Sequence, residues 1–138
     1  MGNIIEMQDM RYLNLFEKVT GVNTRFCFKY NEAIIFCVNR SLISKAIGGN
    51  AENAKKISSI LRRKIKVVAK PNSIEDASKF IGAIVSPVVF KKIDVTDGEI
   101  ILTAGPQSKA ALIGRNKRRL IEMQKIVKTF FNRDFRII

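Results

Sequence analysis

Ile47-Gly48-Gly49-Asn50 is a short motif that this chain of 138 residues repeats, 66 residues later, as Ile113-Gly114-Arg115-Asn116. Each follows a short stretch compatible with a helix and opens a longer amphipathic segment, so glycine marks a break between two helices. The second copy continues into Lys117-Arg118-Arg119. The N–H groups and dipole of a new helix attract anions, so a glycine break beside basic groups favours phosphate binding. The repeat therefore predicts two related units, each with such a loop.

The net charge of the chain supports this interpretation. The sequence holds 25 Lys and Arg against 12 Asp and Glu, which gives +13 at pH 7. Both halves contribute, with +8 over residues 1–70 and +5 over residues 71–138. Basic surfaces of this kind are typical of proteins that bind nucleic acid. A solvated surface that merely favours Lys and Arg is the alternative.

Several classes of function are disfavoured by composition. There is no histidine, and the two cysteines lack a metal-binding spacing. A hairpin with its tip at Asn31-Glu32 places Cys27 and Cys37 on opposite faces, so we expect reduced thiols rather than a disulfide. The apolar run 81–90 is short and interrupted by Ser86-Pro87. We expect a cytoplasmic protein that is not an enzyme, with no metal, cofactor, small-molecule substrate or membrane partner.

Hydrophobic periodicity and turn residues predict the same order of elements twice. In the first copy we expect a helix over 5–18, a hairpin of strands 25–30 and 33–38, a short helix 42–47 capped by Ser41, a longer helix capped by Asn50, a strand 64–69 and a helix at about 73–82. In the second copy we expect strands 88–95 and 99–104, a short helix 107–113, a longer helix after Gly114 and a strand 134–138.

Three aromatic residues alternate along the first predicted strand. Phe26, Phe28 and Tyr30 share one face, and we expect them to pack against the helices. A stacking platform for bases, as in an RRM sheet, is the alternative, but the basic-Gly-aromatic signature of that fold is absent.

Two stretches resemble a known loop. Residues 46–57 resemble the I-G-x-x-G-x-N-hydrophobic-K-K pattern of a K-homology (KH) domain, and residues 112–120 resemble a second copy. The resemblance implies an α+β fold with two tandem type II KH units, each strand-strand-helix-helix-strand. The first unit, with its N-terminal helix and the connecting helix at about 73–82, would span residues 1–84, and the second residues 85–138. Such a pair in one small basic chain resembles the archaeal NusA-like transcription factors.

The resemblance implies that RNA is bound at the two loops and the helices beside them. The implied RNA-binding residues are Lys45, Ile47, Gly48, Gly49, Asn50, Ala51, Lys55, Lys56, Ile113, Gly114, Arg115, Asn116, Lys117, Arg118 and Arg119. Both loops depart from the family pattern, because its second glycine is Ala51 in the first loop and Lys117 in the second. We interpret the alanine as mild, since it favours the following helix.

The two loops differ in charge. Lys117, Arg118 and Arg119 are predicted in the first turn of a helix, where the dipole disfavours each cation by ~0.3–1 kcal/mol unless an anion is bound. Glu52 takes that place in the first copy, and it suits the helix but repels phosphate. We therefore expect the second loop to attract the RNA backbone more strongly.

The implied function is binding of single-stranded RNA without catalysis. By resemblance the role is in transcription elongation, termination or antitermination, with nascent RNA and RNA polymerase as candidate partners. One alternative is a protein–protein adaptor for RNA polymerase or the ribosome whose degenerate loops bind RNA weakly or not at all. Another is a small-subunit ribosomal protein, which a second KH-like unit disfavours.

Overall fold

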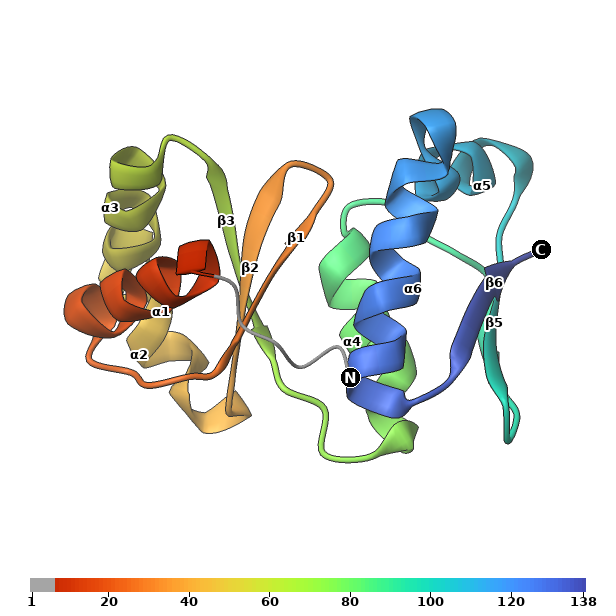
Figure 1. Cartoon of the computed structure of the whole chain (residues 1–138), viewed down its shortest axis with the longest axis horizontal. Helices are drawn as coiled ribbons and strands as arrows, with labels where there is room; N and C mark the ends of the chain where they lie inside the picture. Colours follow the sequence, from red (N-terminus) through yellow and green to blue (C-terminus); the bar gives the residue numbers. More distant parts are fainter. Residues whose placement is uncertain (1–6) are drawn as a thin grey trace. The chain divides into compact units, whose positions relative to one another are not determined.

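Both halves of the chain fold into the same order of elements (Figure 1). The structure, a computed structural model, describes residues 7–138 and is α+β, with six α-helices and two three-stranded sheets in that range. The first half contains α1 (Met7–Thr20), β1 (Phe26–Tyr30), β2 (Ala33–Val38), α2 (Ile43–Ile47), α3 (Glu52–Leu61) and β3 (Lys64–Ala69). The second half contains α4 (Ala77–Val85), β4 (Lys92–Val95), β5 (Glu99–Thr103), α5 (Pro106–Ile113), α6 (Arg118–Phe131) and β6 (Asp134–Ile137).

The two sheets share one topology. The strand orders are β1-β2-β3 and β4-β5-β6. In each sheet the first pair is antiparallel and closed by a hairpin, whereas the second pair is parallel and joined through two helices. A parallel pair needs a crossover, and the two-helix segment that carries the glycine loop supplies it. The repeat in the sequence is therefore a repeat in the fold.

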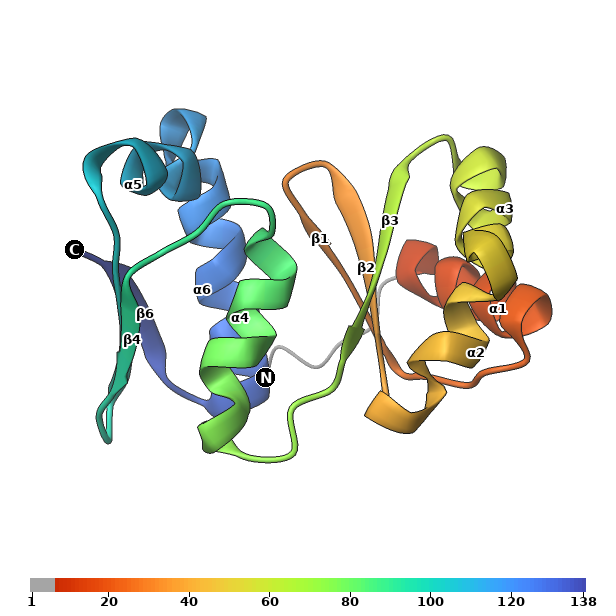
Figure 2. The same cartoon turned by 180° about the vertical axis from the view of Figure 1, so that it is seen from behind.

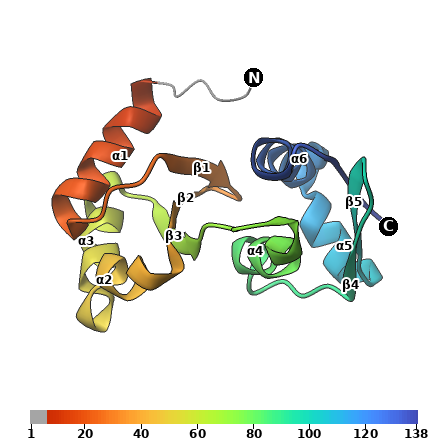
Figure 3. The same cartoon turned by 90° about the horizontal axis from the view of Figure 1, so that it is seen from below.

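The core of the first half lies between its sheet and its helices. Ile34, Phe36 and Val38 alternate along β2 toward α1–α3, and all three are buried. Phe16 of α1 and Ile57 of α3 complete this core. Figure 3 shows α1, α2 and α3 on the same side of the sheet. Helix packing on one face thus fixes where the loop between α2 and α3 can lie.

The sequence predicts that the alternating aromatic residues of β1 pack against the helices. For α1, α2 and α3 this prediction is wrong. Cys27 pairs with Phe36, and both contribute to the core under α1–α3. Because successive side chains of a strand point to opposite faces, Phe26, Phe28 and Tyr30 lie on the other face of the sheet. Alternation along one strand does not tell which face of a hairpin the helices cover. Here Ile34, Phe36 and Val38 of β2 pack against the helices, and Cys27 of β1 shares their face.

The cysteine prediction is confirmed. Phe26 pairs with Cys37 and Cys27 with Phe36, so the two thiols lie on opposite faces. Both cysteines are free, and Cys37 is buried. Burial raises the pKa of the Cys37 thiol strongly, and the nearby Cys27 raises it further, while Lys70 opposes the shift.

The second half packs its helices on one face of its sheet in the same way (Figures 2 and 3). Ile100 and Leu102 of β5 and Phe135 of β6 form the buried row, since Ile100 pairs with Phe135. Met123 and Val127 are buried on α6. The opposite face of the sheet carries charged side chains, with Arg136 Nε 3.1 Å from Glu99 Oε2.

The chain divides into two compact units between Lys70 and Pro71. Helix α4 belongs to the second unit, because the Phe80 ring centroid lies 4.8 Å from that of Phe130 and 5.9 Å from that of Phe131 on α6. The prediction from the sequence assigns this helix to the first domain, which would end at residue 84. Phe80 of this helix packs on α6, a contact between distant parts of the sequence that periodicity alone could not show.

Most predicted elements match closely, and a few boundaries need correction. Residues 5 and 6 of the first predicted helix lie outside the described residues. The fourth helix continues to Val85. Strand β4 starts at Lys92 rather than at 88, since the pairing to β5 begins with Lys92 and Thr103. Ser41 lies inside a 3₁₀ turn, Arg40–Leu42, and caps no helix.

Candidate nucleic-acid interface

The loops between α2 and α3 and between α5 and α6 have the same backbone conformation. Gly48 has φ 82° and ψ 166°, and Gly114 has φ 76° and ψ 173°. In each loop one hydrogen bond closes the turn, from the Ala51 N–H to the Gly48 carbonyl at 3.1 Å and from the Lys117 N–H to the Gly114 carbonyl at 3.2 Å. Only glycine adopts these values of φ and ψ readily, so the first glycine of each motif is required by the backbone.

Two consecutive left-handed residues follow in each loop. Asn50 and Ala51 have φ of 55° and 58°, and Asn116 and Lys117 have φ of 56° and 60°. The prediction that Asn50 caps the helix is wrong, because Asn50 lies inside the turn and Ala51 is the N-cap of α3. Asparagine suits this position because it tolerates the left-handed region. Both asparagines therefore shape the loops.

The positions of the family's second glycine carry backbone strain. Ala51 and Lys117 adopt a left-handed conformation that costs a residue with a Cβ roughly 1–2 kcal/mol. The interpretation of Ala51 as a helix-favouring substitution is therefore wrong, since this residue precedes α3 and is not helical. Lys117 likewise precedes the first turn of α6, which begins at Arg118.

The helices that follow the loops begin without a side-chain cap. The N-cap residues Ala51 and Lys117 make no capping hydrogen bond to α3 or α6. The first N–H groups of a helix need acceptors, which a side chain, water or a ligand can supply. The N–H groups of Glu52 and Arg118 already donate to the carbonyls of Gly49 and Arg115. Attraction of a phosphate oxygen therefore depends on the N–H groups that follow them and on the positive end of the helix dipole.

The side chain five positions after each first glycine lies over that glycine. Asn53 Nδ2 donates to the Lys45 carbonyl at 3.2 Å, and Arg119 Nη1 donates to the Ala111 carbonyl at 2.8 Å. A Cβ on Gly114 would lie 2.9 Å from Arg119 Cγ, and one on Gly48 would lie 3.1 Å from Asn53 Cγ. Arg119 is thus engaged within its own unit, whereas the sequence assigns it to RNA binding alone.

The second loop is the more positive of the two. Arg115 and Lys117 are exposed, and within residues 7–138 their side chains make no hydrogen bond or ion pair. Three acidic groups on the strands of this unit, Asp94, Glu99 and Asp134, form ion pairs with Lys92, Arg136 and Lys128. Figure 1 shows the β4–β5 turn at the opposite end of the unit from the α5–α6 corner. Positive charge therefore accumulates at the loop.

The first loop has weaker electrostatics. Gly49 occupies the position of Arg115, and Glu52 lies in the first turn of α3. The predicted cations Lys45, Lys55 and Lys56 are exposed on α2 and α3 around the loop. Ile47 and Ile113 end α2 and α5 and are partly exposed beside the two loops.

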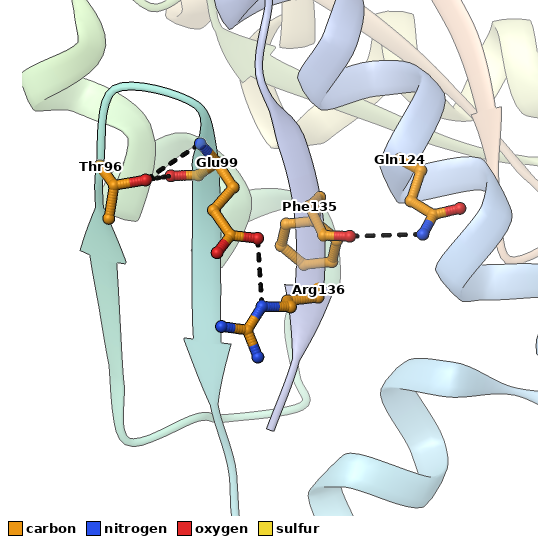
Figure 4. A network of polar contacts seen from close by, with 5 residues as sticks. All are labelled: Thr96, Glu99, Gln124, Phe135 and Arg136. Atoms are coloured by element: carbon orange, nitrogen blue, oxygen red, sulfur yellow. Dashed lines mark hydrogen bonds and ion pairs between the residues drawn. The ribbon is translucent and has the colours of Figure 1, made fainter.

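An open cleft of about 490 Å³ lies along α6 and the start of β6. Ile121, 46% exposed, lines it one turn after the loop, and Lys125 and Lys128 continue along the same helix face. Gln124 Nε2 donates to the Phe135 carbonyl at 3.3 Å and holds β6 against α6 (Figure 4). This apolar and basic cleft was not singled out from the sequence, although Ile121 and Lys125 are visible there at helical spacing.

Within the described residues, Cys, Asp and Glu side chains nowhere gather in threes that could hold a metal ion. None of the helices described in residues 7–138 is long and apolar enough to cross a membrane. The loops themselves present N–H groups and cations, which suit an anion, beside partly exposed apolar side chains.

Comparisons with known proteins bear on this arrangement. The chain is 29% identical over 114 residues to the probable transcription termination protein NusA of Methanococcus vannielii. The match covers 80% of this chain and 64% of the relative, so the chain spans a little under two thirds of that protein's length. The NusA-like resemblance predicted from the sequence is thereby confirmed.

A solved structure shows the same fold. The crystal structure of APE1850 matches with a TM-score of 0.68 at 21% sequence identity, over 97% of this chain and 99% of that chain. At this identity the match shows the fold alone. No protein-family model matches the chain.

Proposed function

We propose that the chain is a non-catalytic protein that binds single-stranded RNA through two glycine loops and acts in transcription elongation, termination or antitermination. The similarity to a probable transcription termination protein NusA supports this role. Nascent RNA is then the ligand, RNA polymerase is a candidate partner, and the cytoplasm is the expected location.

One observation carries the proposal. Two loops far apart in the sequence share the same backbone dihedral angles, and each opens a helix whose first N–H groups have no side-chain cap. An ordinary helix–turn–helix corner would not need to preserve this conformation twice at the expense of strain at Ala51 and Lys117. Binding of a phosphate at the helix N-terminus would explain why both loops keep this conformation.

The order and pairing of the strands support the proposal that both units are type II KH domains. In both, an antiparallel hairpin is followed by two helices and a strand parallel to the central one. We propose that residues 1–84 and 85–138 hold the two KH domains, with α4 as a connecting helix that packs on the second unit, and that RNA is bound by the loop residues assigned from the sequence. Arg119 serves chiefly inside the loop, and Arg115, Lys117 and Arg118 supply contacts to phosphate.

The test is titration of the full chain with short single-stranded RNAs at several salt concentrations. Replacing Lys117 and Arg118 with Ala should weaken binding and reduce the slope of log K against log[salt] by about 0.7 for each lost phosphate contact. The matched control replaces two exposed cations that are not among the assigned RNA-binding residues, Lys29 and Lys79, with Ala. Equal effects of the two double variants would show that net charge, not the loop, attracts RNA.

A second pair of variants tests the loops by repulsion. Arg115→Asp and Gly49→Asp place a carboxylate at equivalent positions. A Cβ on Gly49 meets nothing within 4 Å, so that change tests charge and not packing. Gly114→Asp is unsuitable, because a Cβ there would press on Arg119. Binding should fall for both Asp variants, and more for Arg115→Asp.

The adaptor function remains the second candidate, favoured by one feature. Residues with a side chain replace the family's second glycine in both loops, and Glu52 stands where a phosphate would approach the first. RNA affinity unchanged in all the loop variants, together with binding of RNA polymerase in a pull-down of purified components, would support the adaptor and overturn the RNA-binding proposal.

A further inference from the structure

The contacts of Asn53 and Arg119 form one structural device that the chain builds twice. Each residue lies in the first turns of the longer helix, five positions after the loop's first glycine. Each donates a side-chain hydrogen bond back to the carbonyl three positions before that glycine, on Lys45 or Ala111. The two side chains share neither shape nor charge. Their equivalent contacts therefore follow from the position.

The acceptor in each case is a carbonyl that the helix cannot satisfy. The Gly48 N–H bonds to the Ser44 carbonyl at 2.9 Å, and the Gly114 N–H bonds to the Ala110 carbonyl at 3.0 Å. The next carbonyls, on Lys45 and Ala111, lose their helical donor because the chain turns at the glycine. Asn53 and Arg119 supply the missing donor, and so they join the end of one helix to the start of the next.

The same side chain also explains the absence of a Cβ at the glycine. The stem of Arg119 occupies the space over Gly114, with Cβ and Cδ each 3.2 Å from the site of a Cβ on that glycine. Asn53 does so over Gly48, where its amide nitrogen Nδ2 is 3.1 Å from that site. We call the side chains of Asn53 and Arg119 the clamps of the two loops. In each loop the glycine allows the turn and leaves space above it, and the clamp fills that space and holds the turn.

We propose that Asn53 and Arg119 are positioning residues that hold the two loops in their strained conformation, and that the charge of Arg119 adds a cation to the second loop only. Arg119 donates from one nitrogen to Ala111, and a guanidinium carries five N–H donors. Its charge stays close to the uncapped start of α6 while its geometry is fixed. The uncharged clamp Asn53 gives the first loop the same shape without that charge.

The positioning role is tested without RNA, by amide hydrogen exchange of the full chain. The N–H groups of Ala51 and Lys117 close the two turns and report on loop opening. Arg119→Met keeps the stem but removes every donor, and we expect Lys117 to exchange at least about tenfold faster. Arg119→Asn installs the clamp of the first loop, and protection of Lys117 should return to within about threefold of the original.

Internal controls keep the result interpretable. Exchange at Ala51 in the first loop and at Leu102 in the buried strand β5 should not change in either Arg119 variant. The reciprocal change, Asn53→Leu, should accelerate exchange at Ala51 and leave Lys117 unchanged. Unaltered protection of Lys117 in Arg119→Met overturns the positioning role, whatever the chain binds.

The charge half of the proposal rests on the proposed RNA binding and has a separate readout. In RNA titrations Arg119→Asn, which keeps the loop closed, should weaken binding and lower the salt slope by up to about 0.7. Asn53→Arg should strengthen binding at the first loop. If Arg119→Asn keeps both full affinity and slope, the charge half is wrong although the clamp stands. If the original chain binds no RNA, the proposed function fails and the exchange result still decides the clamp.

Discussion

The ring of Phe16 on α1 stacks on the ring of Phe36 on β2, with centroids 4.3 Å apart and planes inclined by 17°. Both side chains are fully buried. This contact joins the N-terminal helix to the central strand of the first sheet. The helix that precedes the repeated elements is therefore part of the first core, and the loop between α2 and α3 depends on it indirectly.

Phe16→Ala should destabilise the chain by about 3–5 kcal/mol, because it removes a buried ring and leaves a cavity against Phe36. Urea denaturation followed by circular dichroism measures the change. Val89→Ala, at a side chain that is 72% exposed, is the control and should stay within about 0.5 kcal/mol of the original. A similar small effect of Phe16→Ala would mean that α1 is not needed for the first core.

Gly114→Ala and Gly49→Ala make the same chemical change in equivalent segments with opposite expected results. At Gly114 the positive φ of 76° and the close approach to Arg119 Cγ both oppose a methyl group, so we expect a loss of about 1–3 kcal/mol. At Gly49 a Cβ meets nothing within 4 Å and φ is not positive, so stability should stay equal or rise by up to about 1 kcal/mol. Thermal denaturation of both variants, compared at one pH, would expose an error if Gly114→Ala were as stable as Gly49→Ala.

Ala51→Gly should leave stability unchanged or raise it by up to about 1 kcal/mol, since relief of the left-handed strain offsets the added freedom of the unfolded chain. Lys117→Gly should behave in the same way. The control is Ala110→Gly, an identical change at an exposed site inside α5, which should cost about 1 kcal/mol. Denaturant midpoints give the comparison, and a loss at Ala51 equal to that at Ala110 would argue against a strained loop.

The sequence was informative where one physical preference dominates. Strands 33–38 and 64–69 have the predicted bounds because runs of β-branched residues end at turn residues. Pro106 fixes the start of α5, since proline fits the first turn of a helix and no later one. Gly48 and Gly114 likewise predict the positions of both loops, because glycine strongly favours a break between two helices.

Prediction failed where two preferences compete or where partners are distant in the chain. Asparagine favours both a helix N-cap and the left-handed region, and the φ of 55° in the structure shows that Asn50 takes the second. The contacts of Asn53 and Arg119 reach back eight residues across a turn, so helical periodicity does not reveal them. The faces of the first hairpin were ambiguous because Cys27 and the alternating aromatic residues of β1 are both apolar.

The two cysteines should differ in reactivity with a thiol reagent under native conditions. Cys37 is fully buried and its pKa is raised, so it lacks both access and thiolate, whereas Cys27 is partly exposed. Labelling at pH 8 followed by mass spectrometry should modify Cys27 first, with Cys37 reacting only on unfolding. Equal rates for the two thiols would show that Cys37 is not buried in the folded chain.

The same burial predicts a loss of stability at alkaline pH. Above pH 9.0, the ordinary pKa of the thiol, Cys37 ionises in the unfolded chain but stays protonated in the folded one. The unfolded state then binds fewer protons, so the free energy of unfolding falls with rising pH by up to about 1.4 kcal/mol per unit from this residue. Cys37→Val removes the titrating group and keeps an apolar side chain in the core. From pH 8 to pH 10.5 we therefore expect the original chain to lose stability relative to Cys37→Val. Urea denaturation in buffers with a reducing agent measures the free energy of unfolding of both proteins. A constant difference across that range would show that the thiol ionises equally in both states, and that Cys37 is open to solvent in the folded chain.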